Sequence, residues 1–381
     1  MTHETVWNRV SALRARMATE GLDACVLLVV ERSNWEGAYY ISGFRGSSAG
    51  IVITRKDAVL ITDGRYSTQA GEQSPFDIRL HGQRTLTDVL VDVLSETGAR
   101  RIGYEAERVS VRKFEDLRKR DDARAWSDAS ELVPSLRRKK DPEEIASIRK
   151  AADIARDAYL RVLSRVREGM TELEFSAALE YEIRCGGAEG GWGDHGFIVA
   201  SGKRSVLPHG APTGKPFARG EWVTVDYGAR VDGYVSDITR NFSLGEPPAK
   251  VREIEDVLVS AHEEAVRSIR PGVSGREVDR VARAVIAEAG YGEFFVHGLG
   301  HAFGLEVHES PRLSPVSPDT LREGDVVTVE PGIYIEGFGG MRIEDDYLVT
   351  EDGVELLTER FGRRMYRSEE HTSELQSPYV I

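Results

Sequence analysis

Two pairs of acidic residues, each placed around a glycine-containing turn, constrain the fold of this 381-residue chain more than any other feature. Asp226, in EWVTVDYGAR, and Asp237, in YVSDITRNF, lie on either side of Asp232-Gly233, a dipeptide typical of tight hairpin turns. Two strands meeting at this turn would bring the aspartates close together, about 5 Å apart if they are directly opposed. Valines and aromatic residues surround both carboxylates, so burying them is costly unless a cation neutralises their charge. The alternative is a polar hairpin in which both aspartates are exposed.

A second pair of acidic residues repeats this arrangement. Glu330, in VVTVEPGIY, and Glu344, in MRIEDDYLV, flank the glycine-rich stretch 336–340. The two hairpins would therefore each offer a pair of inward carboxylates. Between the hairpins lies HGLGHAFGLEVHESP, which carries His297, His301 and His308. Its glycines argue against a helical HExxH zinc motif and favour strand and loop that present imidazoles at a pocket wall.

These residue types predict a metal site. Four carboxylates and one imidazole form a hard, oxygen-rich ligand set, unlike the thiolates or several histidines of a tetrahedral structural zinc. Four buried carboxylates carry too much charge for one divalent ion. Two ions about 3.5–4 Å apart, sharing bridging carboxylates, would balance the charge and supply a nucleophile at neutral pH. Histidines gather in the same part of the chain, including His195 and His209.

The first third of the chain predicts a separate α/β domain. Residues 4–20 have helical periodicity and lead into DACVLLVV, a continuous apolar run typical of a buried strand, in which Cys25 is a buried small hydrophobe. Further strands are expected at 50–55, 57–62 and RRIGYE, with a helix at 85–97. Strands that alternate with helices favour an α/β fold.

A basic stretch between two prolines, PSLRRKKDP at 134–142, predicts a linker or exposed junction. Asp141 and Pro142 then open a long helix to about Val166, and a second helix begins at Thr171, where TELE has the capping-box pattern. Helices are also expected at 250–268, where we take His262 as a surface residue, and at 274–289. Helices followed by hairpins, once after 141 and once after 250, are compatible with a duplicated half.

Charge is distributed unevenly along the chain. Residues 1–140 hold 23 basic and 20 acidic side chains, whereas residues 141–381 hold 27 and 43. This acidic excess speaks against nucleic-acid binding by the second part. The start has no signal-peptide pattern, and the longest apolar stretch, 24–30, is far shorter than the roughly 20 residues of a membrane span. We expect a cytoplasmic protein with no nucleic-acid or membrane partner.

The spaced motifs VDYG, SDITR, HGLGH, VHESP, VEPGIY and RIEDD resemble those of the pita-bread metallopeptidases, most closely the Xaa-Pro peptidases, aminopeptidase P and prolidase. The resemblance covers nearly all of residues 5–360 and includes YYISGFRGSSAGIVIT with TDGRY, similar to the creatinase/prolidase N-terminal domain. It implies an α/β (α+β) chain with that domain at 1–134 and a pita-bread domain with a curved antiparallel sheet at 135–366. Residues 367–381 continue no pattern of the fold, and we interpret them as a non-native or disordered tail.

The resemblance also implies how metal is bound. Its five ligand positions fall on Asp226, Asp237, His301, Glu330 and Glu344. Asp237 and Glu344 would be the bridging carboxylates between two divalent ions. Mn²⁺ is expected, with Co²⁺ or Zn²⁺ as alternatives, because availability counts as much as ligand type. A homodimer is implied as well.

Catalytic roles follow from the same resemblance. His209, in ASGKRSVLPHG, would contact substrate and help move protons, and either it or Glu330 would pass a proton to the leaving nitrogen. His308 would face the scissile carbonyl and stabilise the developing oxyanion. His297 would line the pocket and Arg342 would lie beside the bridging glutamate; for these two, a purely structural role is as well supported as a catalytic one.

The implied activity is cleavage of the Xaa-Pro imide bond at the N-terminus of short proline-containing peptides, either as an aminopeptidase or as a dipeptidase. Proline has no hydrogen on its nitrogen, so a site with no need to accept one can select it. One departure is GGWGDHGF, which places His195 where the family has an aromatic residue and leaves the preference before proline open. Alternatives are a metal-dependent amide hydrolase acting on a non-peptide substrate, like ectoine hydrolases, and a catalytically silent pita-bread binding protein. A metal-free creatinase-like enzyme is disfavoured because all five ligand residues are present.

Overall fold

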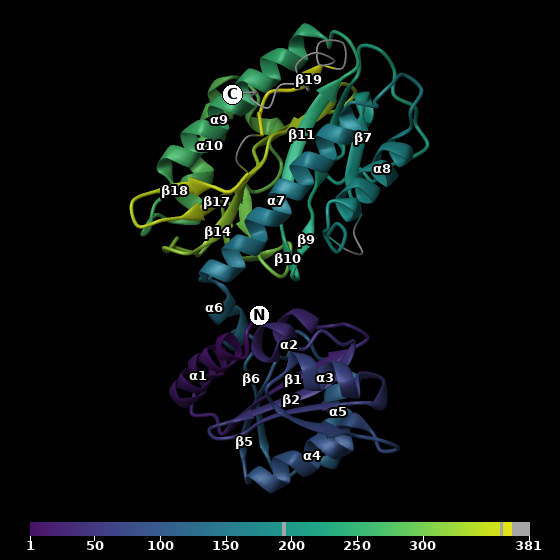
Figure 1. Cartoon of the computed structure of the whole chain (residues 1–381). Helices are drawn as coiled ribbons and strands as arrows, with labels where there is room; N and C mark the ends of the chain where they lie inside the picture. The colour runs from purple at the N-terminus through teal and green to yellow at the C-terminus, as the bar shows by residue number, and fades with distance from the viewer. Residues whose placement is uncertain (193–195, 359–360, 368–381) are drawn as a thin grey trace. The chain divides into compact units, whose positions relative to one another are not determined.

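The chain divides into two compact units, Met1–Arg137 and Arg138–Ile381. The structure is a computed structural model in which residues 1–192, 196–358 and 361–367 are described (Figure 1). His195 and residues 368–381 lie outside the described residues, so the interpretations of GGWGDHGF and of the tail stay predictions. Within the described part, no helix is both long enough and apolar enough to cross a membrane.

The first unit is an α/β domain built on a six-stranded sheet, which confirms the predicted fold class for this part. The sheet order is β4-β3-β2-β1-β5-β6, and β1 pairs antiparallel with β2 but parallel with β5. The strands are β1 (Ala24–Val30), β2 (Ser48–Thr54), β3 (Ala58–Thr62), β4 (Asp77–Leu80), β5 (Arg101–Tyr104) and β6 (Ala125–Asp128). The helices are α1 (His3–Thr19), α2 (Trp35–Ser42), α3 (Ser67–Gln73), α4 (Leu86–Thr97), α5 (Val111–Arg120) and α6 (Leu132–Arg137).

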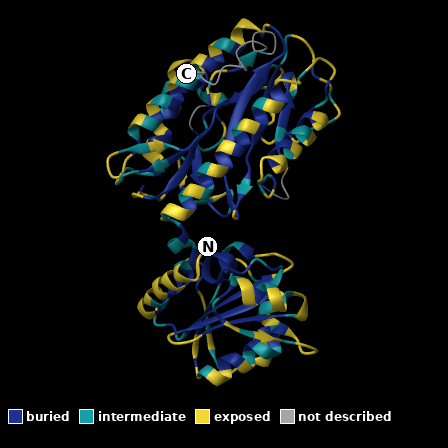
Figure 2. Ribbon diagram, in the orientation of Figure 1, coloured by how far each residue is buried: buried dark blue, intermediate teal, exposed yellow. Residues whose placement is uncertain are grey.

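The centre of this sheet is apolar on both faces. Every residue of β1 except Val30 is buried, including Cys25, as predicted (Figure 2). The helix α2 was not expected from the sequence. Nearly all of its residues are buried, so no polar face marks a helical period in WEGAYYIS.

Among its described residues the second unit has four long helices, and all four agree with the prediction from periodicity: α7 (Pro142–Leu163), α8 (Glu172–Cys185), α9 (Ala249–Ser268) and α10 (Gly275–Glu288). Asp141 and Thr171 each form a complete capping box with a glutamate three residues later. The strands are β7 (Ile198–Ser201), β8 (Trp222–Tyr227), β9 (Arg230–Val231), β10 (Tyr234–Val235), β11 (Ile238–Ser243), β12 (Gly300–Ala302), β13 (Glu309–Leu313), β14 (Val326–Val329), β15 (Gly332–Ile335), β16 (Gly339–Arg342), β17 (Asp345–Val349), β18 (Val354–Leu356) and β19 (Tyr366–Arg367).

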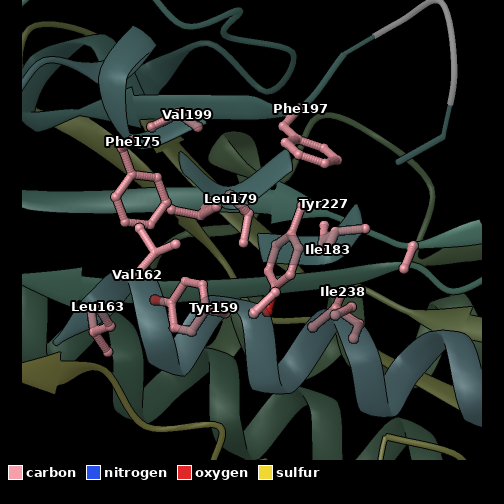
Figure 3. Close-up of a cluster of buried hydrophobic side chains, with 14 of the residues drawn as sticks. Tyr159, Val162, Leu163, Phe175, Leu179, Ile183, Phe197, Val199, Tyr227 and Ile238 are labelled. Atoms are coloured by element: carbon pink, nitrogen blue, oxygen red, sulfur yellow. The ribbon is translucent and has the colours of Figure 1, made fainter. Parts of the chain in front are cut away.

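These elements repeat in order. The first half, residues 142–243, has α7 and α8 followed by β7, β8 and β11 of one sheet, and the second half, residues 249–349, has α9 and α10 followed by β12, β13, β14 and β17 of another. The later strands β19 and β18 extend the first and the second of these sheets, respectively. Figure 3 shows how α7 and α8 of the first half cover their sheet: Tyr159, Phe175 and Leu179 meet Tyr227 and Val199 in one apolar cluster. A separate cluster holds α9 and α10 against their own sheet. The repeat agrees with the expected duplication.

Each half contains a long hairpin that is interrupted near its middle. In the first half, β8–β11 and the short β9–β10 pair share one register around Asp232-Gly233, and both turn residues have positive φ. This confirms the predicted turn, because two adjacent residues with positive φ define the type I′ hairpin. The register places Asp226 opposite Thr239. The two aspartates are therefore not directly opposed, because Asp226 lies farther from the turn than Asp237 does.

The interruption is built around a close backbone approach. Continued by one residue from Tyr227–Ile238, the register places Asp237 opposite Gly228. A Cβ atom on Gly228 would lie 1.8 Å from the carbonyl oxygen of Ser236, so this position accepts only glycine.

The hairpin of the second half follows the same plan. In β14–β17, Val329 is opposite Asp345, and in β15–β16, Gly332 is opposite Arg342. These pairs belong to one register, which places Glu330 opposite Glu344 at the interruption between the strand pairs. Asp237, Glu330 and Glu344 therefore lie where a long hairpin breaks, and Asp226 lies in β8 close to the first break.

The basic stretch at 134–142 is less exposed than expected. Arg138 donates to both carboxylate oxygens of Asp325, at 2.8 Å each. The side chain of Lys140 is 1% exposed, and its Nζ lies 3.1 Å from Glu309 Oε2. The prediction of an exposed junction is therefore wrong at this end of the stretch, where basic side chains pair with acids of the second unit.

Candidate metal centre

Three of the five predicted ligand residues form a compact, buried group. Asp237, His301 and Glu344 each offer one ligand atom, and these atoms all lie within 4.8 Å of one another. Asp237 directly precedes β11, His301 is the middle residue of β12, and Glu344 lies between β16 and β17. An isolated bridge between Thr239 and Glu344 joins the two interrupted hairpins at this point. The group therefore draws on both halves of the second unit.

His301 presents a lone pair to this group. Its Nδ1 lies 3.2 Å from the carbonyl oxygen of Ala302, and a carbonyl accepts only from a protonated nitrogen, so Nε2 is left without a hydrogen. Nε2 lies 3.4 Å from Glu330 Oε1 and 3.7 Å from Asp237 Oδ2. Burial, with the nearby His308, lowers the pKa of His301 to about 3, so the ring is neutral and suited to bind a cation.

The other two predicted ligands, Asp226 and Glu330, lie beside Arg342. The guanidinium Nη2 of Arg342 pairs with Asp226 Oδ2, and its Nε lies 3.9 Å from Glu330 Oε2. Nε also donates to Thr239 Oγ1 at 3.0 Å, and Thr239 in turn donates to Glu344 Oε2 at 2.6 Å. Arg342 thus connects the outer carboxylates to the compact group.

The site concentrates negative charge in a dry environment. Burial raises the pKa of Asp237 well above its usual value, and the charge of Glu344 raises it further. Burial likewise raises the pKa of Glu344 and Asp226, and it raises that of Glu330 to about 8 against the opposing effect of Arg342. Carboxylates crowded in this way require positive charge to ionise together.

The residues present fit a divalent cation. Asp226 Oδ1 is buried and has no hydrogen-bond partner among the described residues, which is costly unless another group binds this oxygen. The donors are carboxylate oxygens with one neutral imidazole, the set that hard and borderline divalent ions prefer.

Two exposed histidines lie near these ligands. His308 is exposed, and its ring centroid lies 4.4 Å from that of His301. His209 is also exposed; the carbonyl of the preceding Pro208 accepts from Arg342 Nη1 at 3.2 Å. Both side chains are therefore accessible to a substrate that approaches the carboxylates.

His297 belongs to a hydrogen-bonded chain that sequence reasoning did not single out. Arg342 Nη1 lies 2.6 Å from the hydroxyl of Tyr334, which lies 3.1 Å from His297 Nε2. Nδ1 of His297 lies 2.7 Å from the carbonyl of Gly298, so Nε2 accepts from the tyrosine. Burial lowers the pKa of His297 to about 4. Tyr334 stands in VEPGIY, four residues after Glu330. This closeness to a predicted ligand is the signal in the sequence that could have identified Tyr334.

The expectation that His262 is a surface residue is wrong. Its side chain is fully buried, with Nε2 3.6 Å from Asp345 Oδ2. It lies on the inner stripe of α9 together with Leu258, Ala261 and Ala265. That helical spacing was visible in the sequence and could have predicted the burial.

Two family models match the chain. Residues 146–351 match metallopeptidase family M24, and residues 9–139 match the creatinase/prolidase N-terminal domain. A Xaa-Pro dipeptidase of Pyrococcus horikoshii is 38% identical over 343 residues, which cover 90% of this chain and 94% of the relative.

Solved structures extend the likeness to the whole fold. The X-Pro aminopeptidase from Thermotoga maritima has a TM-score of 0.87 at 40% identity, covering 92% of this chain and 99% of that one. A Xaa-Pro dipeptidase from Bacillus anthracis has a TM-score of 0.90 at 37% identity, covering 95% and 99%. A creatinase/prolidase-type domain is thus followed by a pita-bread domain, and the chain belongs to metallopeptidase family M24, a family of metal-dependent hydrolases.

Proposed function

We propose that this chain hydrolyses the Xaa-Pro bond at the N-terminus of short peptides, using two divalent metal ions. The observation that carries the proposal is the gathering of one neutral imidazole, three buried carboxylates and the half-buried carboxylate of Glu330 from both halves of the second unit, with exposed histidines beside them. Relatives named as Xaa-Pro dipeptidase and X-Pro aminopeptidase support the choice of substrate.

The proposed metal ligands are Asp226, Asp237, His301, Glu330 and Glu344. Asp237 and Glu344 belong to the compact group and are the proposed bridging carboxylates. Ions held there would polarise the scissile carbonyl and generate a nucleophile from water at neutral pH. Mn²⁺ is the proposed metal, with Co²⁺ and Zn²⁺ as alternatives.

The chain's own side chains would orient substrate and move protons. His308, exposed beside His301, would donate a hydrogen bond to the oxyanion that develops on the carbonyl. His209, or Glu330, would pass a proton to the proline nitrogen as the bond breaks. Arg342 would keep Asp226 in place, and His297 would line the pocket through its contact with Tyr334.

A substrate panel tests this proposal. The purified chain, loaded with Mn²⁺, is assayed on Xaa-Pro dipeptides, on longer Xaa-Pro peptides and on the same peptides with alanine in place of proline. We expect cleavage only before proline and two metal ions per chain by elemental analysis. Preference for dipeptides or for longer peptides distinguishes a dipeptidase from an aminopeptidase.

Two outcomes would contradict the proposal. Hydrolysis of a non-peptide amide such as an ectoine-type substrate, with none of the peptides, would favour an amide hydrolase. Metal binding without any turnover would favour a binding protein. A homodimer and a cytoplasmic location stay predictions, which light scattering and cell fractionation check.

A further inference from the structure

Glu172 is a buried carboxylate that no part of the proposed mechanism uses. It is the first residue of α8, its side chain is 0% exposed, and its two oxygens accept hydrogen bonds from two separate points of the chain. Oε1 accepts from the backbone N–H of Ser201 at 2.9 Å and from its hydroxyl at 2.8 Å. Oε2 accepts from the backbone N–H of Thr213 at 3.0 Å and from its hydroxyl at 2.7 Å.

The two points are the ends of one loop, residues 201–213, which carries His209. Glu172 therefore closes the base of this loop as a single acceptor shared by both ends. Arg204, inside the loop, lies 3.1 Å from Glu172 Oε2 and donates to the carbonyl of Ala211 at 2.7 Å. Glu172 thus also holds Arg204, whose bond to Ala211 connects the parts of the loop before and after His209.

The remainder of the loop is held from the metal side. Gly340 donates from its backbone to Ser205 Oγ at 2.9 Å, and Arg342 donates to the carbonyl of Pro208 at 3.2 Å. His209 itself stays exposed, so its position depends on the backbone that carries it. That backbone is held by Gly340 and Arg342 near its tip, by the N–H of Val199, which donates to the carbonyl of Gly210 at 3.2 Å, and by Glu172 at its base.

A role in helix capping alone does not account for Glu172. The capping box of α8 is completed by Thr171 and Glu174, and the acceptor capacity of Glu172 goes to the loop. Burial by itself would raise the pKa of Glu172, but the hydrogen bonds from Thr213 and Ser201 outweigh this effect and hold the pKa below its usual value. The carboxylate is therefore ionised at neutral pH, and charge-assisted hydrogen bonds are the strong ones.

We propose that Glu172 is a positioning residue for His209: by gathering Ser201, Thr213 and Arg204, it sets where the imidazole stands relative to the metal centre. This inference rests on the proposed function, because His209 is the proton-moving group there. The described hydrogen bonds of the Glu172 side chain go to Ser201, Arg204 and Thr213 and to none of the five proposed ligand residues, so we expect metal binding not to depend on it.

The chain offers a matched control on the same helix. Glu182, also in α8, has a side chain that is 9% exposed and pairs with Arg161 and Arg165, away from the loop. Glu172→Gln and Glu182→Gln therefore make the same chemical change in two buried glutamates of one helix. A glutamine at 172 can no longer serve both loop ends, because one oxygen is replaced by a donor.

The first experiment needs no substrate. Hydrogen–deuterium exchange of residues 201–213 is measured in the wild-type chain and in both variants. We expect exchange in this segment to become about tenfold faster in Glu172→Gln and to stay unchanged in Glu182→Gln, because opening of the loop loses its shared acceptor. Equal exchange in the two variants would overturn the proposal.

The second experiment is a double-mutant cycle with His209→Ala. Glu172→Gln alone should lower kcat for an Xaa-Pro peptide by about 10–100-fold, with metal content unchanged. In the His209→Ala background, Glu172→Gln should cost less than about threefold, because the imidazole that it positions is gone. If the two losses instead multiply, Glu172 acts independently of His209 and the proposal is wrong.

Thr213→Val is a milder variant should Glu172→Gln fail to fold. It removes one hydroxyl donor from Glu172 at a half-buried position, and we expect the same pattern at smaller amplitude. If the wild-type chain cleaves no Xaa-Pro peptide, the proposed function fails, and exchange of residues 201–213 then decides the role of Glu172.

Discussion

In the first half of the second unit, Asp237 stands at the interruption of the hairpin opposite Gly228, and in the second half Glu344 stands at the matching place opposite Glu330. Their partners across the halves also correspond. Thr239, which is paired with Asp226, donates to Glu344, whereas Asp346, which is paired with Thr328, accepts from the backbone of Asp237 at 3.1 Å. Each hairpin thus supports the bridging candidate of the other.

The other two carboxylates of the proposed site, Asp226 and Glu330, depart from this correspondence. Asp226 matches Thr328 of the second hairpin, and Glu330 matches Gly228 of the first. The outer carboxylates therefore come from different register positions: Glu330 has the imidazole of His301 at 3.4 Å, whereas Asp226 pairs with Arg342. The duplication of the two halves explains why Asp237 and Glu344 occupy matching positions. The different positions of Asp226 and Glu330 make the two ends of the proposed metal site chemically unequal.

The largest expected effect comes from replacing one of the two proposed bridging carboxylates, Asp237 and Glu344. Asp237→Asn removes a proposed ligand from both ions and should lower kcat/KM by about a thousandfold or more, which corresponds to the several kcal/mol that bound metal contributes. Kinetics and elemental analysis in Mn²⁺-containing buffer check this. Asp232→Asn, at the exposed turn of the same hairpin, is the control and should be active. Full turnover of Asp237→Asn would end the dinuclear proposal.

The next prediction concerns the close backbone approach at Gly228 in the first hairpin. Gly228→Ala places a Cβ atom 1.8 Å from the carbonyl oxygen of Ser236, and we expect the free energy of unfolding in urea to fall by about 1–3 kcal/mol or more. At Gly214, in the same half, an added Cβ meets nothing within 4 Å, so Gly214→Ala should not destabilise. An equally stable Gly228→Ala would show that the two strands of the first hairpin need not approach as closely as described.

A smaller effect distinguishes how the two halves hold their histidines. In the second half, Asp279 of α10 accepts from the backbone of Leu299 at 3.1 Å and from Arg283 at 3.0 Å, and Arg283 donates to the carbonyl of His297 at 2.8 Å. Asp279→Asn should cost about 1–3 kcal/mol of unfolding free energy. Because Tyr334 also holds the ring of His297, kcat should fall less than about threefold.

Urea unfolding and steady-state kinetics on the same preparation check this prediction. The result is compared with that of Glu172→Gln, because Tyr334 holds the ring of His297, whereas none of the described hydrogen bonds holds the ring of His209. A loss of kcat in Asp279→Asn as large as in Glu172→Gln would remove the distinction between the two histidines.

The smallest effect depends on pH. In the first half, Tyr159 of α7 stacks on Tyr227, with ring centroids 5.4 Å apart, whereas in the second half His262 of α9 faces Tyr347 at 5.8 Å. Burial lowers the pKa of His262 from 6.5 to about 4, although the charge of Asp345 opposes this. The unfolded state therefore binds more protons between these values, and stability is present above pH 6.5 and lost as the pH falls towards 4.

We expect this histidine to account for about 2 kcal/mol of the stability lost between pH 7.5 and pH 5. Urea unfolding at both pH values measures it, and His262→Leu should remove that part of the loss. Arg240 and Arg363, which also approach Asp345, are unchanged in the variant. The same pH dependence in His262→Leu and wild type would contradict the assignment.

Much of the site could be predicted because its signals are local. The turn Asp232-Gly233, the capping boxes of α7 and α8, and the acids in apolar strands each lie within a few residues of sequence. Local patterns also placed His301 on a strand. The burial of His262 was equally local, and it was missed although the stripe of α9 contains it.

What could not be predicted depends on contacts between distant residues. Arg342 meets Asp226 only after the two halves come together, and no spacing in the sequence indicates that encounter. The same holds for Glu172, whose hydrogen bonds reach Ser201 and Thr213. Tertiary structure decides these positions.

The ion pair of Lys140 with Glu309 has a practical consequence for dissecting the protein. The family match begins at residue 146, and a shortened chain that started there would lack Lys140. Glu309 would then lose the lysine that pairs with it. The side chain of Glu309 is only 8% exposed, and this residue directly follows His308. A fragment intended to represent the catalytic domain should therefore begin at Arg138, so that the last basic residues before α7 travel with the domain whose acids they neutralise.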